Sequence, residues 1–162
     1  MGDRELRDII NRLAERFPEK ESVILPALCY LQNRDGYVST GGMRSIAVII
    51  NVPEARVFST ASFYSMINLE PEGKYIIQIC TNVVCTLLTE NPLLAYVSNS
   101  LGISEGEATP DGLFSIKEVE CLGACGYAPA MQINAERYEN LTYERVDEII
   151  ASIIKSESRG GE

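Results

Sequence analysis

The chain has 162 residues, of which 46% are hydrophobic and 23% charged, and its net charge of −9 disfavours nucleic-acid binding, which needs cationic side chains facing phosphates. It contains no histidine, which excludes His-ligated metal sites, Ser-His-Asp triads and Cys-His dyads, and leaves cysteine or carboxylate as the only metal ligands. Its apolar runs are shorter than the roughly 20 residues of a membrane span and it begins without a signal-peptide pattern, so we expect a cytoplasmic protein with no direct membrane insertion.

The first seventy residues predict a small helical bundle, expected over residues 1–70. Apolar residues recur there at helical spacing, and Pro18, Gly36 and Pro53 mark where helices stop or start. Pro53 is placed as a first-turn residue, which proline favours because its missing N–H has no partner there anyway. The expected helices cover residues 6–17, 22–34 and 40–50, with a fourth starting at 53.

Composition changes around Glu70 and Pro71, and we expect a second domain over residues 71–155. The run at 74–80, KYIIQIC, is rich in β-branched and aromatic residues and predicts a strand. The polar tail at 156–162 is expected to be disordered. The remaining expected elements are a helix at 87–101, with its start limited by Pro92, a turn at 111–112, strands at 113–120, 130–134 and 136–139, and a helix at 142–154. This order, close to β-α-β-β-β-α, predicts an α/β (α+β) fold class.

Four of the five cysteines form two local pairs. Cys80 and Cys85 make a C-x4-C pair where the first expected strand ends, and Cys121 and Cys125 make a C-x3-C pair after another strand. Loops at strand ends commonly carry function, and two such loops could converge on one object. A [2Fe–2S] cluster uses four thiolates, two per iron, so two local pairs suit it. The pairs therefore favour an iron–sulfur cluster.

Other interpretations of the pairs stay open at this point. Structural zinc favours C-x2-C spacing, which neither pair has. A free-standing thioredoxin-like dithiol oxidoreductase would need C-x-x-C, which is missing. Disulfides would suit a secreted protein, and four unrelated buried cysteines are a further alternative. Cys29 lies inside an expected helix, far from the pairs, and is interpreted as a small buried apolar residue.

Several motifs add a family resemblance. The segment 119–134, VECLGACGYAPAMQIN, resembles the second ligand pair of the thioredoxin-like [2Fe–2S] family. That family includes the 24 kDa-type subunit of NADH:quinone oxidoreductase (complex I) and the small subunits of NAD(P)-linked hydrogenases, electron-bifurcating ones among them, and of formate dehydrogenases. The resemblance covers residues 5–154. Its other landmarks are LQNRDGYV at 31–38, ASFY at 61–64, PEGKY at 71–75 and LGISEGEATPDG at 101–112.

The resemblance implies a small helical bundle followed by a thioredoxin-like [2Fe–2S] ferredoxin domain. It also implies one [2Fe–2S] cluster on Cys80, Cys85, Cys121 and Cys125, and docking on a larger flavoprotein that binds FMN and NAD(H). The sequence has no nucleotide-binding glycine motif, so we expect no catalytic residues and no complete active site in this chain. The predicted function is one-electron transfer as a subunit of complex I; the equivalent hydrogenase or formate dehydrogenase subunit is the alternative, and a zinc-stabilised interaction module is a distant one.

Two further features lead to expectations. The family usually has glycine four residues after its second cysteine, where this chain has Thr89, and a positive φ there would strain a threonine. Gly123 and Gly126 are expected to let backbone N–H groups approach the sulfur atoms. Whether Tyr127 shields the cluster or faces the flavoprotein is left open. An apolar run could form a core segment or a partner-binding stripe, and core packing is favoured: its residues are Phe63, Tyr64, Met66 and Ile67.

Overall fold

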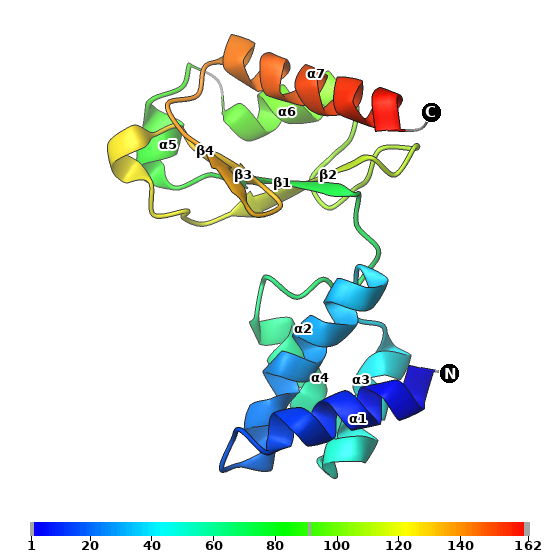
Figure 1. Ribbon diagram of the computed structural model, residues 1–162. Helices are drawn as coiled ribbons and strands as arrows, with labels where there is room; N and C mark the ends of the chain where they lie inside the picture. The colour runs from blue at the N-terminus through cyan, green and yellow to red at the C-terminus, as the bar shows by residue number, and fades with distance from the viewer. Residues whose placement is uncertain (1, 91, 161–162) are drawn as a thin grey trace. The chain divides into compact units, whose positions relative to one another are not determined.

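The computed structural model describes residues 2–90 and 92–160, and the chain divides into two compact units, Met1–Pro71 and Glu72–Glu162 (Figure 1). The first, here the helical unit, contains only helices among its described residues. The second, here the sheet unit, combines a four-stranded sheet with helices. The predicted fold class, with the helical part first, is confirmed. Among the described residues, no helix is both long and apolar enough to cross a bilayer.

The helical unit buries one apolar core formed by helices close to the predicted ones. Ser39 caps the third long helix, where its side-chain oxygen accepts the N–H of Gly42 at 3.1 Å. Gly36 ends the second in the left-handed conformation, with φ of +83°. The elements are α1 (Gly2–Ala14), η1 (Lys20–Val23), α2 (Ile24–Asp35), α3 (Thr40–Ile50) and α4 (Glu54–Phe63).

The first helix is shorter than predicted. It ends at Ala14, and backbone hydrogen bonds from Arg16 to Leu13 and from Phe17 to Ala14 close a tighter turn after it. A residue before proline avoids the helical conformation, so the chain leaves the helix before Pro18. The side chain of Phe17 is 37% exposed and does not extend the buried face of α1.

The apolar run after α4 also differs from its prediction. Ile67 is buried, with 5% of its surface exposed, as core packing requires. Phe63 is 80% exposed, Met66 60% and Tyr64 37%, so core packing is wrong for these three. The reason is local: Tyr64 ends α4 in an extended conformation, and only one side of the following turn faces the core.

The sheet unit has the strand order β2-β1-β3-β4. β1 and β2 run parallel, with Tyr75 opposite Phe114 and Cys80 opposite Val119. β3 pairs antiparallel with both β1 and β4. α6 and α7 lie side by side over one face of the sheet (Figure 1). The elements are β1 (Tyr75–Cys80), α5 (Val83–Leu87), α6 (Leu93–Leu101), β2 (Phe114–Val119), η2 (Cys125–Tyr127), β3 (Met131–Ile133), β4 (Glu136–Tyr138) and α7 (Tyr143–Gly160).

The single helix expected at 87–101 is wrong. α5 ends at Leu87, and α6 begins at Leu93 after Pro92, which occupies its N-cap. Proline disfavours the helical conformation in the residue before it, so a helix cannot run unbroken through this position without cost. Residue 91, inside the expected helix, lies outside the described residues.

The C-terminal helix is longer than predicted. α7 continues to Gly160, so residues 156–160 are helical and not disordered; residues 161–162 of the expected tail lie outside the described residues. The hydroxyls of Ser156 and Ser158 donate to carbonyls one turn back. Glu157 accepts a hydrogen bond from Lys74 Nζ at 2.6 Å and one from the Tyr75 hydroxyl at 2.8 Å. These contacts join the end of α7 to the start of β1.

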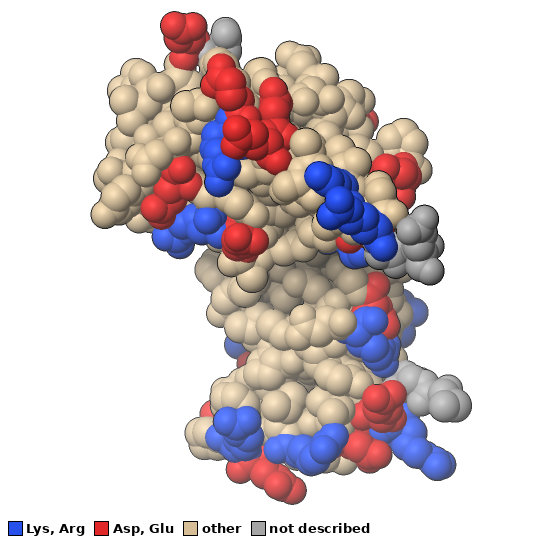
Figure 2. All heavy atoms as spheres, turned by 45° about the horizontal axis from the view of Figure 1, so that its top comes forward, with Lys and Arg blue, Asp and Glu red and all other residues tan. Residues whose placement is uncertain are grey.

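Charge is divided unevenly between the two units. The sequence of the helical unit holds nine acidic and eight basic residues, a net charge of −1. The sheet unit holds fourteen acidic and six basic residues, a net charge of −8. Figure 2 shows acidic side chains gathered on the surface of the sheet unit. Almost the whole negative charge of the chain therefore belongs to the unit with the paired cysteines.

Candidate metal centre

The fold brings the two cysteine pairs to one edge of the sheet. Cys80 is the last residue of β1, and Cys85 follows in the short helix α5. Cys121 comes two residues after Val119, the end of β2, and Cys125 opens η2. Because β1 and β2 are parallel neighbours with Cys80 opposite Val119, both pairs leave the sheet at the same edge.

The pKa of Cys80 reflects the groups that surround its sulfur. Burial raises this pKa, but hydrogen bonds from the backbone N–H groups of Asn82 and Leu122 lower it. Interactions with the thiols of Cys85 and Cys121 lower it further. Together they outweigh burial, and the pKa of Cys80 lies below its ordinary value of 9.0. This thiol therefore ionises more readily than an ordinary cysteine, and a thiol must be ionised to act as a metal ligand.

The other thiols complete a mutually interacting group. Burial raises the pKa of Cys85, the Cys80 thiol raises it further, and the backbone N–H of Ala130 opposes both. The charge of Cys121 is the main cause of the raised pKa of Cys125, to which Cys80 also contributes. Each of the four thiols thus interacts with others across both pairs. A bound cation would relieve the repulsion that raises these pKa values.

The two pairs differ in exposure. Cys80 and Cys85 are 5% and 4% exposed and lie in a small apolar cluster with Ala124 and Ala130. Cys121 and Cys125 are exposed. The site therefore has a closed side, formed by the first pair, and an open side, formed by the second.

The loop of the second pair directs backbone donors at sulfur. The N–H of Gly123 donates to Cys121 Sγ at 3.3 Å, and Gly123 adopts a positive φ of +72°, which favours glycine. Gly126 has an ordinary φ, and nothing would crowd a Cβ atom there, so its predicted role is not needed by the backbone. N–H groups that point at sulfur stabilise thiolates and tune the potential of an iron–sulfur cluster.

The donor set fits an iron–sulfur cluster. Within residues 2–90 and 92–160, no three Cys, Asp or Glu side chains are arranged around one point as ligands of a single metal ion. A [2Fe–2S] cluster takes four thiolates, two per iron, and the chain supplies cysteines in two pairs. Thiolate ligands with backbone N–H donors also match its chemistry.

Comparison with known proteins decides the family. The family described as thioredoxin-like [2Fe-2S] ferredoxin matches residues 10–154. The chain belongs to this thioredoxin-like ferredoxin family. The sequence resemblance is thereby confirmed. The four-stranded sheet with α6 and α7 is its thioredoxin-like domain, and the helical unit precedes it.

Two relatives of this ferredoxin family member align with it over most of both chains. A subunit of NADH-quinone oxidoreductase from Rhizobium meliloti is 38% identical over 152 residues, which cover 94% of this chain and 90% of the relative. A subunit of NADH-quinone oxidoreductase from Aquifex aeolicus is 36% identical, covering 91% and 92%. A crystal structure of an NAD+-reducing [NiFe]-hydrogenase in the H2-reduced state has a TM-score of 0.67 at 23% identity. It matches 79% of this chain, which spans 22% of the hydrogenase chain, and shows the shared fold alone.

Within this ferredoxin fold, Thr89 is accommodated without the strain considered above. Among described residues other than glycine, positive φ values occur at Asn51, Asn134 and Asn140, and not at Thr89. The Thr89 hydroxyl donates to the carbonyl of Thr86 at 3.3 Å. The loop after α5 therefore closes in a conformation that does not require glycine.

Exposed apolar side chains lie close in sequence to the paired cysteines of the ferredoxin domain, and most of them were not predicted from the sequence. Val83 is 62% exposed, Leu87 78% and Leu88 62%, all on or next to α5. Tyr127, left open before, is 59% exposed and lies two residues from Cys125. The signal was the run VVCTLL, since a helix of five residues is too short to bury apolar residues on all sides.

Proposed function

We propose that this chain carries single electrons as the small iron–sulfur subunit of an NADH-oxidising complex, with NADH:quinone oxidoreductase as the favoured parent complex. The observation that carries the proposal is the meeting of two cysteine pairs at one sheet edge in a thioredoxin-like ferredoxin. Relatives named as subunits of that oxidoreductase match nearly their whole length, which supports the choice of complex.

In this proposal Cys80, Cys85, Cys121 and Cys125 hold one [2Fe–2S] cluster, which supplies one-electron chemistry when bound. The apolar cluster around the first pair excludes water from the closed side. Backbone N–H groups offset thiolate charge, and the second pair leaves an open side for exchange with a partner.

FMN and NAD(H) are assigned to a partner flavoprotein, because this chain lacks a nucleotide-binding glycine motif. No residue of the chain is assigned a catalytic role, so it is a component of an enzyme without a complete active site. We place it in the cytoplasm, with any membrane association arising through the complex. The fold shared with an NAD+-reducing hydrogenase favours the equivalent hydrogenase subunit as the second candidate.

Metal analysis tests the proposal. The full chain would be purified without oxygen, assayed for iron, sulfide and zinc, and measured by EPR after reduction. Two irons and two sulfides per chain with a rhombic spin-half signal are expected of a [2Fe–2S] centre. Stoichiometric zinc, or a metal-free chain with a reversible disulfide, would contradict it. Neighbouring genes separate the parent complexes: membrane quinone-reducing subunits accompany one, and a hydrogenase catalytic subunit the other.

A further inference from the structure

The peptide group between Thr81 and Asn82 lies beside the first cysteine of the candidate site. Its N–H, which belongs to Asn82, donates to the sulfur of Cys80. Its carbonyl, which belongs to Thr81, accepts a hydrogen bond from the hydroxyl of Thr86 at 2.9 Å. A peptide group is planar and stiff, so a movement of its carbonyl also moves its N–H. The hydroxyl of Thr86 and the sulfur of Cys80 are therefore coupled through one peptide group.

The residue that carries this carbonyl is fixed to the neighbouring strand. The N–H of Thr81 donates to the carbonyl of Val119 at 3.1 Å, and its hydroxyl donates to Glu118 Oε1 at 2.7 Å. Both partners belong to β2, so these bonds hold the N–H and the side chain of Thr81 to the sheet. The orientation of its carbonyl depends on the rotation that follows its Cα atom. The hydrogen bond from Thr86 restrains that rotation.

Thr86 is itself well placed to hold the peptide. Its N–H donates to the carbonyl of Asn82 at 3.0 Å, in the first turn of α5. It follows Cys85 directly, so the helix that carries the second proposed ligand also carries this hydroxyl. The side chain of Thr86 is exposed, so its replacement opens no cavity in the apolar cluster that contains Cys80 and Cys85.

Hydrogen bonds to the sulfur atoms are one of the factors that set the reduction potential of an iron–sulfur centre. One added electron makes such a centre more negative, and an N–H that points at a ligand sulfur stabilises the added charge. A peptide group whose carbonyl accepts a hydrogen bond is polarised, which strengthens its N–H as a donor. The hydroxyl of Thr86 thus supports the N–H of Asn82 both by orientation and by polarisation.

We propose that Thr86 is a positioning residue that raises the reduction potential of the cluster, by holding the Thr81–Asn82 peptide with its N–H directed at Cys80. Thr86 acts through this peptide and does not itself bind the cluster. This inference rests on the proposed function and adds to it a residue that is not a ligand.

A redox titration monitored by EPR tests this role in the full chain with its cluster. Thr86→Val keeps the shape of the side chain and removes the hydroxyl, whereas Thr86→Ser keeps a hydroxyl. Thr86→Ala also removes the hydroxyl and favours a helix more than valine does, so it serves if the valine variant folds poorly. Thermal midpoints and iron content are measured for every variant.

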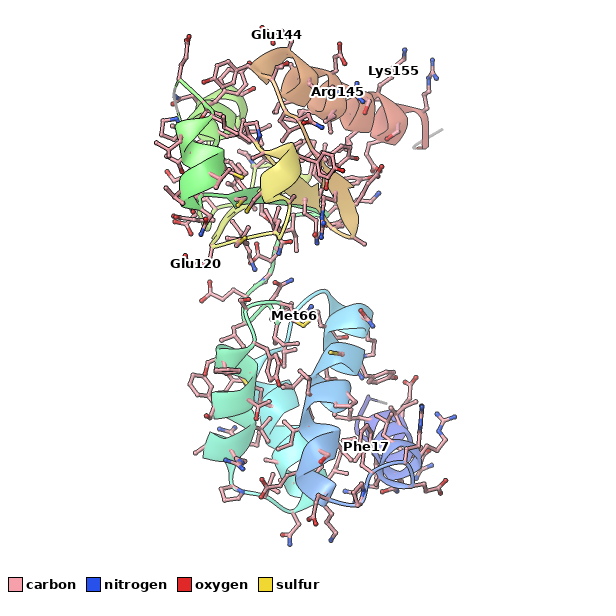
Figure 3. The ribbon with its side chains drawn as sticks, turned by 90° about the vertical axis from the view of Figure 1, so that its left-hand side faces the viewer. Phe17, Met66, Glu120, Glu144, Arg145 and Lys155 are labelled. Carbon is pink, nitrogen blue, oxygen red and sulfur yellow. The ribbon has the colours of Figure 1, made fainter. Side chains whose placement is uncertain are left out.

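The matched control is Ser152→Ala, which removes a hydroxyl of the same kind far from the cysteines. The Ser152 hydroxyl donates to the carbonyl of Ile149 at 2.7 Å, within α7. Figure 3 shows the part of α7 between Arg145 and Lys155 on the opposite side of the sheet unit from Glu120, where the second cysteine loop begins. A general effect of losing a hydroxyl would therefore appear in this control as well.

We expect Thr86→Val and Thr86→Ala to weaken uptake of the electron at least about threefold, which lowers the potential by about 28 mV at about 59 mV per tenfold change. Thr86→Ser and Ser152→Ala should stay within about 1.5-fold of wild type. An unchanged or higher potential in the two variants without a hydroxyl would overturn the inference, as would an equal shift in Ser152→Ala. A wild-type chain without iron would instead refute the proposed function, and this inference with it.

Discussion

Gly73 and Phe114 lie in direct backbone contact where the chain enters the sheet unit. A Cβ atom at Gly73 would overlap the carbonyl carbon of Phe114 and lie 2.6 Å from the backbone nitrogen of Ser115. Neither neighbour is a flexible side chain, so neither can move aside without disturbing β2. The adjacent hydrogen bond from Lys74 N–H to the carbonyl of Gly112, at 3.0 Å, depends on this close approach.

We therefore expect Gly73→Ala to destabilise the sheet unit by about 2–3 kcal/mol, the upper part of the usual range for overpacking. Gly126→Ala is the matched control in the same unit, since nothing lies within 4 Å of its added Cβ atom and its φ is ordinary. That control should change stability by less than about 0.5 kcal/mol. Urea unfolding of the two variants measures the difference, and equal effects would refute the steric explanation.

Substitution of Ser115 is expected to raise stability, whereas substitution of Gly73 is expected to lower it. Its side chain is fully buried, and its hydroxyl has no hydrogen-bond partner within the described residues. A buried hydroxyl without a partner is costly, so Ser115→Ala should raise stability by about 1 kcal/mol. Thr109→Val is the contrast, because the Thr109 hydroxyl accepts the N–H of Phe114 at 2.9 Å and donates to Asp111. It should lower stability by about 1–2 kcal/mol. A destabilised Ser115→Ala variant would reveal an unseen partner.

We expect four of the five cysteines to be cluster ligands and Cys29 to have no part in binding the cluster. Cys85→Ser and Cys125→Ser, one from each pair, should each lose or alter the cluster, because a harder oxygen ligand replaces a thiolate. Cys29→Ser should retain wild-type iron content and EPR signal, since Cys29 packs against the core of the helical unit. Iron assay, visible absorption and EPR measure this. Loss of the signal in the Cys29 variant would overturn the assignment of ligands.

The hydrogen bonds of Glu157 with Lys74 and Tyr75, which join α7 to β1, should make the stability of the protein depend on pH. Hydrogen bonds from Lys74 and then Tyr75 hold the pKa of Glu157 below its ordinary value of 4.5. Between the lowered pKa and 4.5 the unfolded chain binds more protons, so this contribution is present above pH 4.5 and is lost below it. The stability difference between wild type and Glu157→Gln should therefore be constant above pH 4.5 and shrink in more acid solution.

Urea unfolding midpoints measured at several pH values check the contribution of the Lys74–Glu157 ion pair. Lys74→Met removes the main cause of the lowered pKa and should reproduce much of the same change. The double variant should show less than the sum of the two single effects, because both act on one ion pair. Full additivity would mean that Lys74 and Glu157 do not act together.

Helix positions were predictable where a local signal is strong. Ser39 and Gly36 act as the caps that their residue types favour, and the predicted helix at 40–50 coincides with α3. Errors arose where apolar spacing continued past a local stop. The pattern ran on through Phe17 although Pro18 turns the chain before it, and one helix was drawn across Pro92.

The candidate site was only partly predictable. Strand ends and spacing pointed to two converging cysteine pairs, but not to a buried first pair and an exposed second pair. That difference depends on Ala124 and Ala130 packing beside Cys80, a tertiary contact that no local pattern encodes. The exposed state of Phe63 was missed for the same reason, since a helix-end aromatic is buried or exposed according to what packs over it.

The hydrogen bonds of Glu157 with Lys74 and Tyr75 affect how the sheet unit could be inserted into other polypeptides. It fixes the end of α7 beside Lys74, at the entry to β1, so the first and last elements of the unit finish next to each other. A domain whose ends are adjacent tolerates insertion and circular permutation, because a short linker can join them without crossing the interior. We expect a permuted sheet unit, opened at the exposed turn near Gly106, to keep its sheet.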